Sequence, residues 1–329
     1  QLQGLAARRW SSLAVSTAGA AVRNADPRLS FAKAPAGPKS AAGAERLQAL
    51  LERGFVRLPG VVPAADVGAM HDTLWADIAH RHGVRRHDPE VWSSRRGQDP
   101  RLYGPPPTSL TESVQYAFLK QRVHDLVGDM LGPQTWRLKG KATMFVDCPD
   151  AGASWTMPLG WHTDVSVDPS DLWPKFVYAF AFLDFVESRG GATMLLAGST
   201  RRLQLMNELV KVGGHNFKAA LARENPWFAE LFFPEAGEAC TGEISLRRAL
   251  SEEERTSRLM WSGVVSKGIP MRVEELTGAP GDLLLWDPRA LHSASCNTSS
   301  RPRSVLKFRL ELGPWRQRQM EAALAASRQ

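Results

Sequence analysis

The chain has 329 residues, enough for one large core or two modest domains, so its length leaves the number of domains open. Hydrophobic residues make up 43% of it and charged residues 23%, the balance of an ordinary globular protein. No uninterrupted apolar run approaches the roughly 18 to 20 residues that a membrane-spanning helix needs. We therefore expect a soluble intracellular protein without a membrane span.

The net charge of +7 is concentrated near the N-terminus. Residues 1–44 contain six Lys and Arg residues against one acid, Asp26, a local charge of +5 that leaves +2 for the rest of the chain. The same stretch is rich in Ala and Ser, which suits either a disordered tail or a chloroplast or mitochondrial transit peptide. Because the bulk charge supplies no basic stripe, a nucleic-acid partner is not expected.

The cysteines argue for a reducing compartment. Cys148, Cys240 and Cys296 are odd in number, far apart and free of any C-x-x-C pair. That pattern disfavours both a disulfide framework and a zinc knuckle.

Helices are expected in the first part of the chain. Ordered sequence is predicted to begin at Glu45, with a short helix at 45–51 and an apolar run at 54–58. Pro63 precedes a helix whose apolar residues at 67, 70, 74 and 78 share one face. After a Pro- and Arg-rich loop at 87–107, a second amphipathic helix is expected from about 113 to 132. Its predicted buried residues are Val114, Phe118, Leu126 and Met130.

From residue 139 onward the chain predicts many short strands, because apolar or alternating runs are separated by Gly, Pro and Asp. The runs are 142–148, 161–167, 176–185, 192–197, 271–276, 282–286 and 304–312. They favour a closed or sandwiched antiparallel β architecture flanked by the earlier helices. The predicted domain spans 45–315 and is followed by a helical tail at 316–329.

A helical insert at about 203–262 interrupts the strands. Ser251 and Glu254 have the spacing of a capping box. An insert of this length is more often a lid or a partner surface than a bare connection. Four of its side chains either cover an active site or are ordinary solvated and packing residues: His215, Lys218, Arg223 and Trp227.

The sequence WHTD at 161–164 is the first candidate site. Period-two geometry places His162 and Asp164 on one face, so both could ligate one metal ion. His292, after the strand-like run at 282–286, is the best placed third ligand. Two imidazoles and one carboxylate leave three octahedral positions free, as iron(II) needs to bind a chelating co-substrate and dioxygen. Taken alone, an H-x-D triplet is weak evidence, because it also occurs by chance. In that case the histidine and the aspartate would form an ordinary hydrogen-bonded pair on the surface.

Arg303 adds the second half of the site. It lies eleven positions after His292 and begins a run in which residues 303, 305, 307 and 309 share a face. An inward arginine beside a metal is costly unless an anion neutralises it, and a guanidinium binds a carboxylate bidentately. The far end of a metal-chelating dicarboxylate would satisfy it. Arg301 is the competing arginine, but it precedes Pro302 and belongs to the turn.

These pieces together resemble the phytanoyl-CoA dioxygenase family, a branch of the 2-oxoglutarate oxygenases, over about residues 45–313. The similar segments are ERGFV at 52–56, TMFV at 143–146, WHTD at 161–164, GGAT at 190–193, GST at 198–200, PGDL at 280–283, LHSA at 291–294 and RPRS at 301–304. No single segment is specific, but their order and spacing are. The resemblance implies a mainly β protein with flanking helices and a double-stranded β-helix core, the jelly-roll or cupin-like barrel.

The resemblance also implies roles for individual residues. His162, Asp164 and His292 match the iron ligands, and Arg303 matches the arginine that pairs with the distal carboxylate of 2-oxoglutarate. Met144, Phe180 and Ser293 fall where relatives line the co-substrate pocket, with Ser295 as an alternative to Ser293. For Met144 and Phe180, a position in the plain barrel core explains the sequence equally well.

The activity implied is a dioxygenase that hydroxylates a small organic or acyl substrate and releases succinate and carbon dioxide. Its cofactors would be iron(II), 2-oxoglutarate as co-substrate and ascorbate as reductant. Because halogenating relatives lack the ligand carboxylate, the presence of Asp164 favours hydroxylation.

Three other functions remain open. Arg303 and Arg309 match the R-x-x-x-x-x-R pattern of nucleic-acid-dealkylating relatives, although the chain beyond the N-terminal stretch carries little net charge. The barrel could instead be a non-catalytic metal-binding scaffold. A cupin that uses zinc or manganese would have the same barrel but would leave Arg303 unexplained.

Overall fold

The computed structural model describes residues 38–93, 101–132, 136–150, 152–169, 174–206, 210, 216–234 and 250–312. Residues 1–37 of the leader predicted at 1–44, the predicted tail from 316 and Cys240 lie outside these residues. Within the described residues, Cys148 and Cys296 form no disulfide. Within the described ranges, no helix is both long enough and apolar enough to cross a bilayer.

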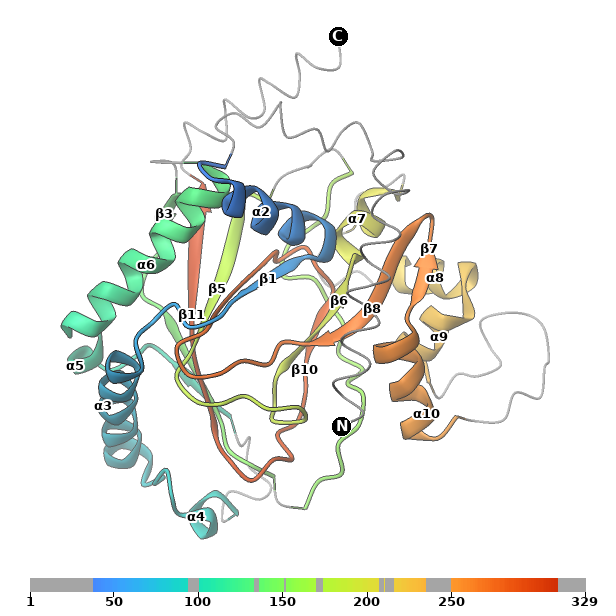
Figure 1. The fold of residues 1–329 in the computed structure, drawn as a ribbon. Coiled ribbons are helices and arrows are strands. Elements are labelled where there is room, and N and C mark those ends of the chain that lie inside the picture. Colours follow the sequence, from blue (N-terminus) through green and yellow to red (C-terminus); the bar gives the residue numbers. More distant parts are fainter. Residues whose placement is uncertain are drawn as a thin grey trace.

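A larger antiparallel sheet forms one wall of the fold (Figure 1). Its strands follow the order β1 (Phe55–Leu58), β9 (Leu283–Trp286), β5 (Phe176–Phe182), β11 (Arg303–Leu312), β4 (Thr143–Asp147) and β2 (Arg101–Gly104), and β3 (Trp136–Leu138) pairs with β11.

A smaller sheet forms the opposite wall, in the order β10 (His292–Ala294), β6 (Thr193–Ala197), β8 (Ile269–Glu275) and β7 (Val264–Ser266). An isolated bridge between His162 and His292 extends it past β10. Along the chain, β4, the His162 bridge, β5, β6 with β8, β9, β10 and β11 fall alternately in the larger and the smaller sheet. This alternation is the double-stranded β-helix, so the predicted fold class is confirmed.

The space between the sheets is filled by inward side chains of both. Phe180, Phe182 and Val305 of the larger sheet pack in one cluster with Leu195 and Ala197 of the smaller one. Side chains on alternate positions point outward to the helices, as the two-residue period of a strand requires. Each sheet therefore has an inner face toward the barrel and an outer face toward a helical layer.

Helices α3 (Ala64–His82), α5 (Thr108–Thr111) and α6 (Val114–Leu131) cover the outer face of the larger sheet (Figure 1). The face predicted for α3 is confirmed, since its residues at 67, 70, 74 and 78 are buried. Helix α2 (Ala41–Arg53) begins before the predicted Glu45, because Ser40 caps it by accepting a hydrogen bond from the backbone N–H of Gly43. A short helix, α4 (Pro89–Ser93), follows α3.

The buried face predicted for α6 was wrong at its first two positions. Val114 and Phe118 are 75% and 40% exposed, whereas Tyr116, Leu119, Val123 and Val127 are buried together with Met130. Two apolar stripes of this helix fit the 3.6-residue period, and the sheet selects the one whose Tyr116 packs on Phe308 of β11.

The insert forms a second helical layer over the outer face of the smaller sheet. Its described elements are α7 (Ser199–Gln204), α8 (Asn216–Glu224), α9 (Pro226–Phe232), α10 (Glu252–Thr256) and a π-helical turn (Ser257–Ser262). Phe217 and Phe228 pack in one cluster with Met194 and Leu196 of β6. The capping box of Ser251 and Glu254 is confirmed. Most of the described insert is therefore a packing layer.

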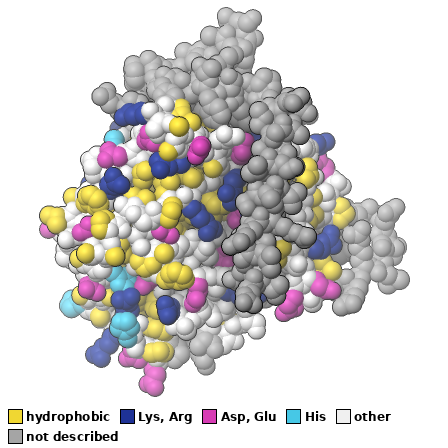
Figure 2. Space-filling view, viewed as in Figure 1, with side chains coloured by type: hydrophobic (Ala, Val, Ile, Leu, Met, Phe, Trp, Pro, Cys, Tyr) yellow, Lys and Arg dark blue, Asp and Glu magenta, His cyan; other side chains and the backbone are white. Residues whose placement is uncertain are grey.

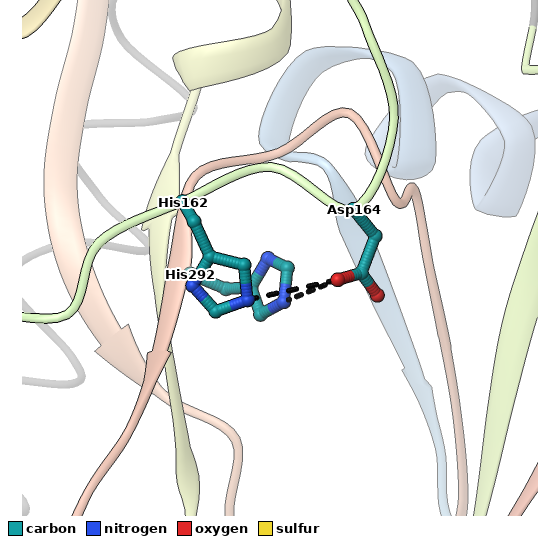
Figure 3. A group of neighbouring side chains, drawn as sticks. All are labelled: His162, Asp164 and His292. Carbon is teal, nitrogen blue, oxygen red and sulfur yellow. Dashed lines mark ion pairs between the residues drawn. The ribbon is translucent and has the colours of Figure 1, made fainter. Parts of the chain in front are cut away.

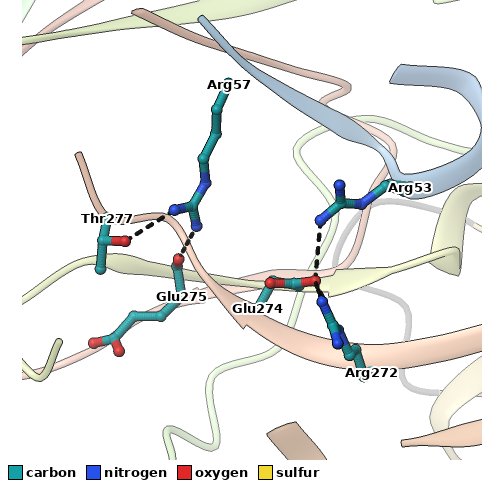
Figure 4. A network of polar contacts seen from close by, with 6 residues as sticks. All are labelled: Arg53, Arg57, Arg272, Glu274, Glu275 and Thr277. Carbon is teal, nitrogen blue, oxygen red and sulfur yellow. Dashed lines mark hydrogen bonds and ion pairs between the residues drawn. The ribbon is translucent and has the colours of Figure 1, made fainter. Parts of the chain in front are cut away.

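A polar network joins the N-terminal elements to the end of β8 (Figure 4). Arg53 and Arg272 both pair with Glu274, the former at 3.1 Å. Arg57 donates to the Thr277 hydroxyl at 3.0 Å and to the Glu275 carbonyl. Burial lowers the pKa of Arg57, and the neighbouring carboxylates act against that shift. The network holds α2 and β1 across the two sheets.

Asp184, just after β5, links the larger sheet to α3. Its carboxylate lies 2.8 Å from Nε2 of the buried His71 and 3.3 Å from Arg86. Burial alone would raise the pKa of Asp184, but the hydrogen bond and charge of His71, with smaller contributions from Ser304 and Arg86, hold it below its usual value. A carboxylate with a lowered pKa stabilises the fold above its unfolded-state pKa and loses that contribution as the pH falls through its folded-state pKa.

We expect Asp184→Asn to lower the free energy of unfolding by about 1 to 3 kcal/mol at pH 7, because it weakens buried hydrogen bonds to charged groups. The difference from the parent should shrink below about pH 4, where the unfolded carboxyl becomes protonated. Urea unfolding at several pH values measures both effects. Asp72→Asn, on the exposed side of α3, is the control and should change stability by less than about 0.5 kcal/mol. A pH-independent difference for Asp184→Asn would contradict this account.

Candidate metal centre

Backbone hydrogen bonds place the first two candidate ligands. The N–H of His162 donates to the carbonyl of His292, and the N–H of His292 donates to that of His162, each at 2.9 Å. The N–H of Asp164 donates to the carbonyl of Pro288 at 3.0 Å. The strand predicted at 161–167 is reduced to isolated bridges at His162 and Val167. Three bonds thus hold an irregular segment against β10 and the turn after β9.

The three predicted metal ligands meet in space (Figure 3). Nε2 of His162 lies 3.6 Å from Oδ1 of Asp164, and Nε2 of His292 lies 3.5 Å from the same oxygen. One ligand atom from each of the three residues lies within 4.8 Å of the others. Residues 128 positions apart in the sequence, such as Asp164 and His292, are therefore brought to one point.

Both imidazoles are oriented by a second contact. Nδ1 of His162 lies 2.7 Å from the carbonyl of Gly160, and Nδ1 of His292 lies 3.0 Å from that of Ala290. A carbonyl can only accept, so each Nδ1 carries a proton and each Nε2 is directed toward Asp164, where a metal ion would take the place of a proton. Trp286 supports His292 from the side, with 4.7 Å between ring centres.

The electrostatics keep the carboxylate ionised. Burial alone would raise the pKa of Asp164, but hydrogen bonds with His162 and His292 and the charges of His292 and Lys307 hold it well below its usual range. The hydrogen bond to Asp164 raises the pKa of His162, whereas partial burial and the charge of Lys218 act in the opposite direction. The group therefore presents an ionised carboxylate beside two imidazoles.

The donor set fits a divalent transition metal. Two imidazole nitrogens and one carboxylate oxygen form the facial arrangement of non-haem iron(II) sites. The side chains of His162 and Asp164 are 48% and 26% exposed, whereas that of His292 is 8% exposed. An ion bound here would be reached from the His162 side and would keep coordination positions free.

Arg303 is buried on the inner face of β11, where the register pairs it with Asp147 of β4. Its Nη1 donates to Oδ2 of Asp147 at 2.9 Å and to the carbonyl of Gly191. Its Nε is buried and has no acceptor among the described residues. This unpaired donor fits a further carboxylate oxygen, so the residue suits the distal end of 2-oxoglutarate.

The structure does not bring Met144 or Ser293 to the inner face. Met144 packs in the cluster beneath α3 and α6, and its neighbour Phe145 points inward instead. Ser293 alternates with His292 along β10 and pairs with Met194, which faces the insert. Ser295 donates to the carbonyl of Ala192 at 2.8 Å. The two-residue period of the strands turns these side chains away from the barrel.

Phe180 does lie on the inner face. Its ring centre is 5.6 Å from that of Trp286 and 6.4 Å from that of Phe145. It thereby forms part of the inner wall of the barrel beside Trp286. Contact of Phe180 with the co-substrate stays a prediction.

The sequence reasoning missed two inward residues beside Asp164. Tyr178 is within electrostatic range of Asp164, and burial together with the charge of that carboxylate raises the pKa of Tyr178 to about 12. Lys307 holds its Nζ 4.3 Å from the centre of the Tyr178 ring. The alternation that placed Arg303 inward also placed Lys307 inward, so the signal was present in the sequence.

A sequence profile of the family described as phytanoyl-CoA dioxygenase (PhyH) matches residues 50–305. This match spans more than half of the chain, and the chain belongs to that family. By class it is a 2-oxoglutarate-dependent oxygenase, for which iron(II) and 2-oxoglutarate are the metal and the co-substrate. No curated protein sequence matches the chain.

Several solved structures are similar at low identity. The epimerase SnoN, in complex with Fe3+, alpha ketoglutarate and nogalamycin RO, has a TM-score of 0.46 and 16% identity, covering 83% of this chain and 87% of SnoN. HygX from Streptomyces hygroscopicus, with nickel and 2-oxoglutarate, has a TM-score of 0.47 and 16% identity, covering 82% and 86%. EctD from S. alaskensis, with 2-oxoglutarate and 5-hydroxyectoine, has a TM-score of 0.48 and 15% identity, covering 88% and 84%. Family membership rests on the sequence profile and not on these likenesses.

We expect His162→Ala to weaken iron(II) binding by more than about 100-fold, because it removes a metal ligand. Loss of a residue that only hydrogen-bonds to a ligand typically costs roughly 10- to 100-fold. Anaerobic titration with iron(II), followed by calorimetry, measures the affinity. His124→Ala is the matched control, since its ring nitrogen also contacts a backbone carbonyl, that of Trp136, but lies on α6. Equal affinity of the two variants would contradict the ligand assignment.

Proposed function

We propose that this protein is an iron(II)- and 2-oxoglutarate-dependent hydroxylase that acts on a small organic or acyl substrate and releases succinate and carbon dioxide. The observation that carries the proposal is the intact convergence of His162, Asp164 and His292. When bound there, iron(II) with 2-oxoglutarate and dioxygen supplies the oxidising power that replaces a substrate C–H bond by C–OH.

The residues of the chain provide position and environment. His162, Asp164 and His292 would hold the metal, with both Nε2 atoms fixed by the contacts at Nδ1. The apolar wall of Phe180 and Trp286 would exclude water from the reacting atoms. Because Asp164 occupies the position that a halide takes in halogenating relatives, hydroxylation is the reaction that this ligand set favours.

Arg303 would hold the distal carboxylate of 2-oxoglutarate. Asp147 keeps the guanidinium in place through Nη1 and leaves Nε unpaired for the incoming oxygen. A planar guanidinium that is already fixed on one edge loses little freedom on binding, so more of the interaction energy appears as affinity. Asp147 is thus a positioning residue.

The nucleic-acid alternative is less well supported. Arg309, the second arginine of the pattern, pairs with Glu311 at 2.7 Å and lies over the ring of Phe176. On the described part of the face in Figure 2, basic and acidic side chains are interspersed and form no continuous basic strip. A substrate polyanion would need such a strip.

We expect the purified protein, supplied with iron(II), ascorbate and 2-oxoglutarate, to release succinate and to incorporate oxygen-18 from dioxygen into it. His162→Ala should abolish this turnover. In the presence of a substrate, mass spectrometry should show a product that has gained one oxygen-18 atom. Absence of succinate from metal-loaded protein would favour the scaffold function, and turnover without oxygen in the organic product would exclude hydroxylation.

We expect Arg303→Met to raise the KM for 2-oxoglutarate by about 10- to 100-fold while iron(II) affinity is retained, because charge-assisted hydrogen bonds are lost. The single variant leaves Asp147 buried without its partner, so the double variant Asp147→Asn with Arg303→Met is measured beside it. Steady-state succinate release at varied 2-oxoglutarate gives the KM. An unchanged KM in the folded double variant would remove Arg303 from the co-substrate site.

A further inference from the structure

Lys307 is a cation without an anionic side-chain contact on the inner wall. It lies on β11 between Val305, which is part of the barrel core, and Arg309. Its Nζ is 4.3 Å from the ring centre of Tyr178 and 5.1 Å from that of Phe145. Within the described part of the chain it makes no hydrogen bond and no ion pair, although Arg309 beside it pairs with Glu311.

A chain of contacts connects Lys307 to the metal ligands. The Tyr178 ring beneath its ammonium lies 4.9 Å from Trp286, and Trp286 lies 4.7 Å from His292. The charge of Asp164 acts on both Tyr178 and Lys307. A group held by Lys307 would therefore lie beside the metal, within the barrel.

A second lysine, on the insert, lies within electrostatic range of the site. Phe217, at the start of α8, is buried in one cluster with Trp161, the residue before His162. The next residue, Lys218, acts electrostatically on His162. Lys218 likewise has no ion pair within the described ranges, and partial burial lowers the pKa of both ammonium groups.

Charge counting shows what these lysines require, and this step rests on the proposed function. The metal dication and the two lysines bring four positive charges. Asp164 and the dianion of 2-oxoglutarate bring three negative charges, and Arg303 with Asp147 cancel. One positive charge remains uncompensated in a partly buried site, where contacts with aromatic rings offset only part of the cost of burying a cation.

We propose that Lys307, with Lys218 as a second cation, binds an acidic group of the organic substrate, a carboxylate or a phosphate, and that the enzyme therefore selects anionic small molecules. Such a group would supply the missing negative charge and would orient the substrate from its acidic end toward the metal. The other possible source of an anion here is 2-oxoglutarate itself, which the experiment separates.

The test uses pairs of probes of matched shape that differ in charge: benzoate and benzamide, octanoate and octanamide, phenyl phosphate and phenol. Dissociation constants are measured on the anaerobic complex of the full chain with iron(II) and 2-oxoglutarate, from the change in its visible absorption. We expect at least one acid to bind about tenfold or more tightly than its neutral partner, the effect of one charge-assisted hydrogen bond.

Variants assign that preference to the lysine. Lys307→Met keeps an unbranched side chain against Tyr178 and should remove the preference for the acid, whereas Lys307→Arg should retain most of it. Lys120→Met is the matched control, because the Lys120 Nζ also lies over a tyrosine ring, that of Tyr116, but on α6 outside the barrel. It should leave the preference unchanged. Lys218→Met should reduce the preference by a smaller factor.

Two results would overturn the inference while leaving the proposed function intact. In the first, succinate is released but no acid binds more tightly than its neutral partner. In the second, Lys307→Met raises the KM for 2-oxoglutarate without substrate, which would assign the lysine to the co-substrate. Failure of the proposed function itself would appear separately, as absence of succinate release from every form of the protein.

Discussion

The pair of backbone hydrogen bonds between His162 and His292 is the constraint on which the site depends. Each residue donates to and accepts from the other, so the two imidazoles leave one edge of the smaller sheet at adjacent positions. A chelating group requires its donors to be fixed before the metal arrives, because ordering them afterwards would consume binding energy. Here the hydrogen bonds of the sheet fix the two histidines when the protein folds. One further backbone hydrogen bond, from Asp164 to Pro288 in the turn after β9, fixes the third ligand.

Strand alternation then sorts the remaining side chains. On β11 the inner face carries Arg303, Val305, Lys307 and Arg309, while Leu306 and Phe308 face the helices. Charged side chains on the inside of a barrel are costly unless partners compensate them. Among the described residues, Asp147 compensates Arg303 and Glu311 compensates Arg309, whereas Lys307 forms no ion pair and is acted on by the charge of Asp164.

The features of the fold and site that depend on residues close together in the sequence could be predicted from the sequence. The metal ligands and the inward Arg303 follow from alternation and from the order of the motifs, and the caps of α6 and α10 follow from Ser113 and Ser251. The rest depends on tertiary choice. Helix α6 has two apolar stripes, and only the sheet selects between them. Met144 and Phe145 are adjacent, so a shift of one position decides which of them faces the barrel.

The insert shows how a fold shared with a family can acquire its own substrate. Its helices complete the hydrophobic layer over the smaller sheet, and the buried Phe217 ties α8 to the residue next to His162. The same helix carries Lys218, whose charge acts on His162. Because the barrel supplies Lys307 and the insert supplies Lys218, the charge of the site is set by two elements with different packing constraints. Under the proposal above, a change at either lysine alters substrate selection without removing a metal ligand, because neither β11 nor α8 carries one.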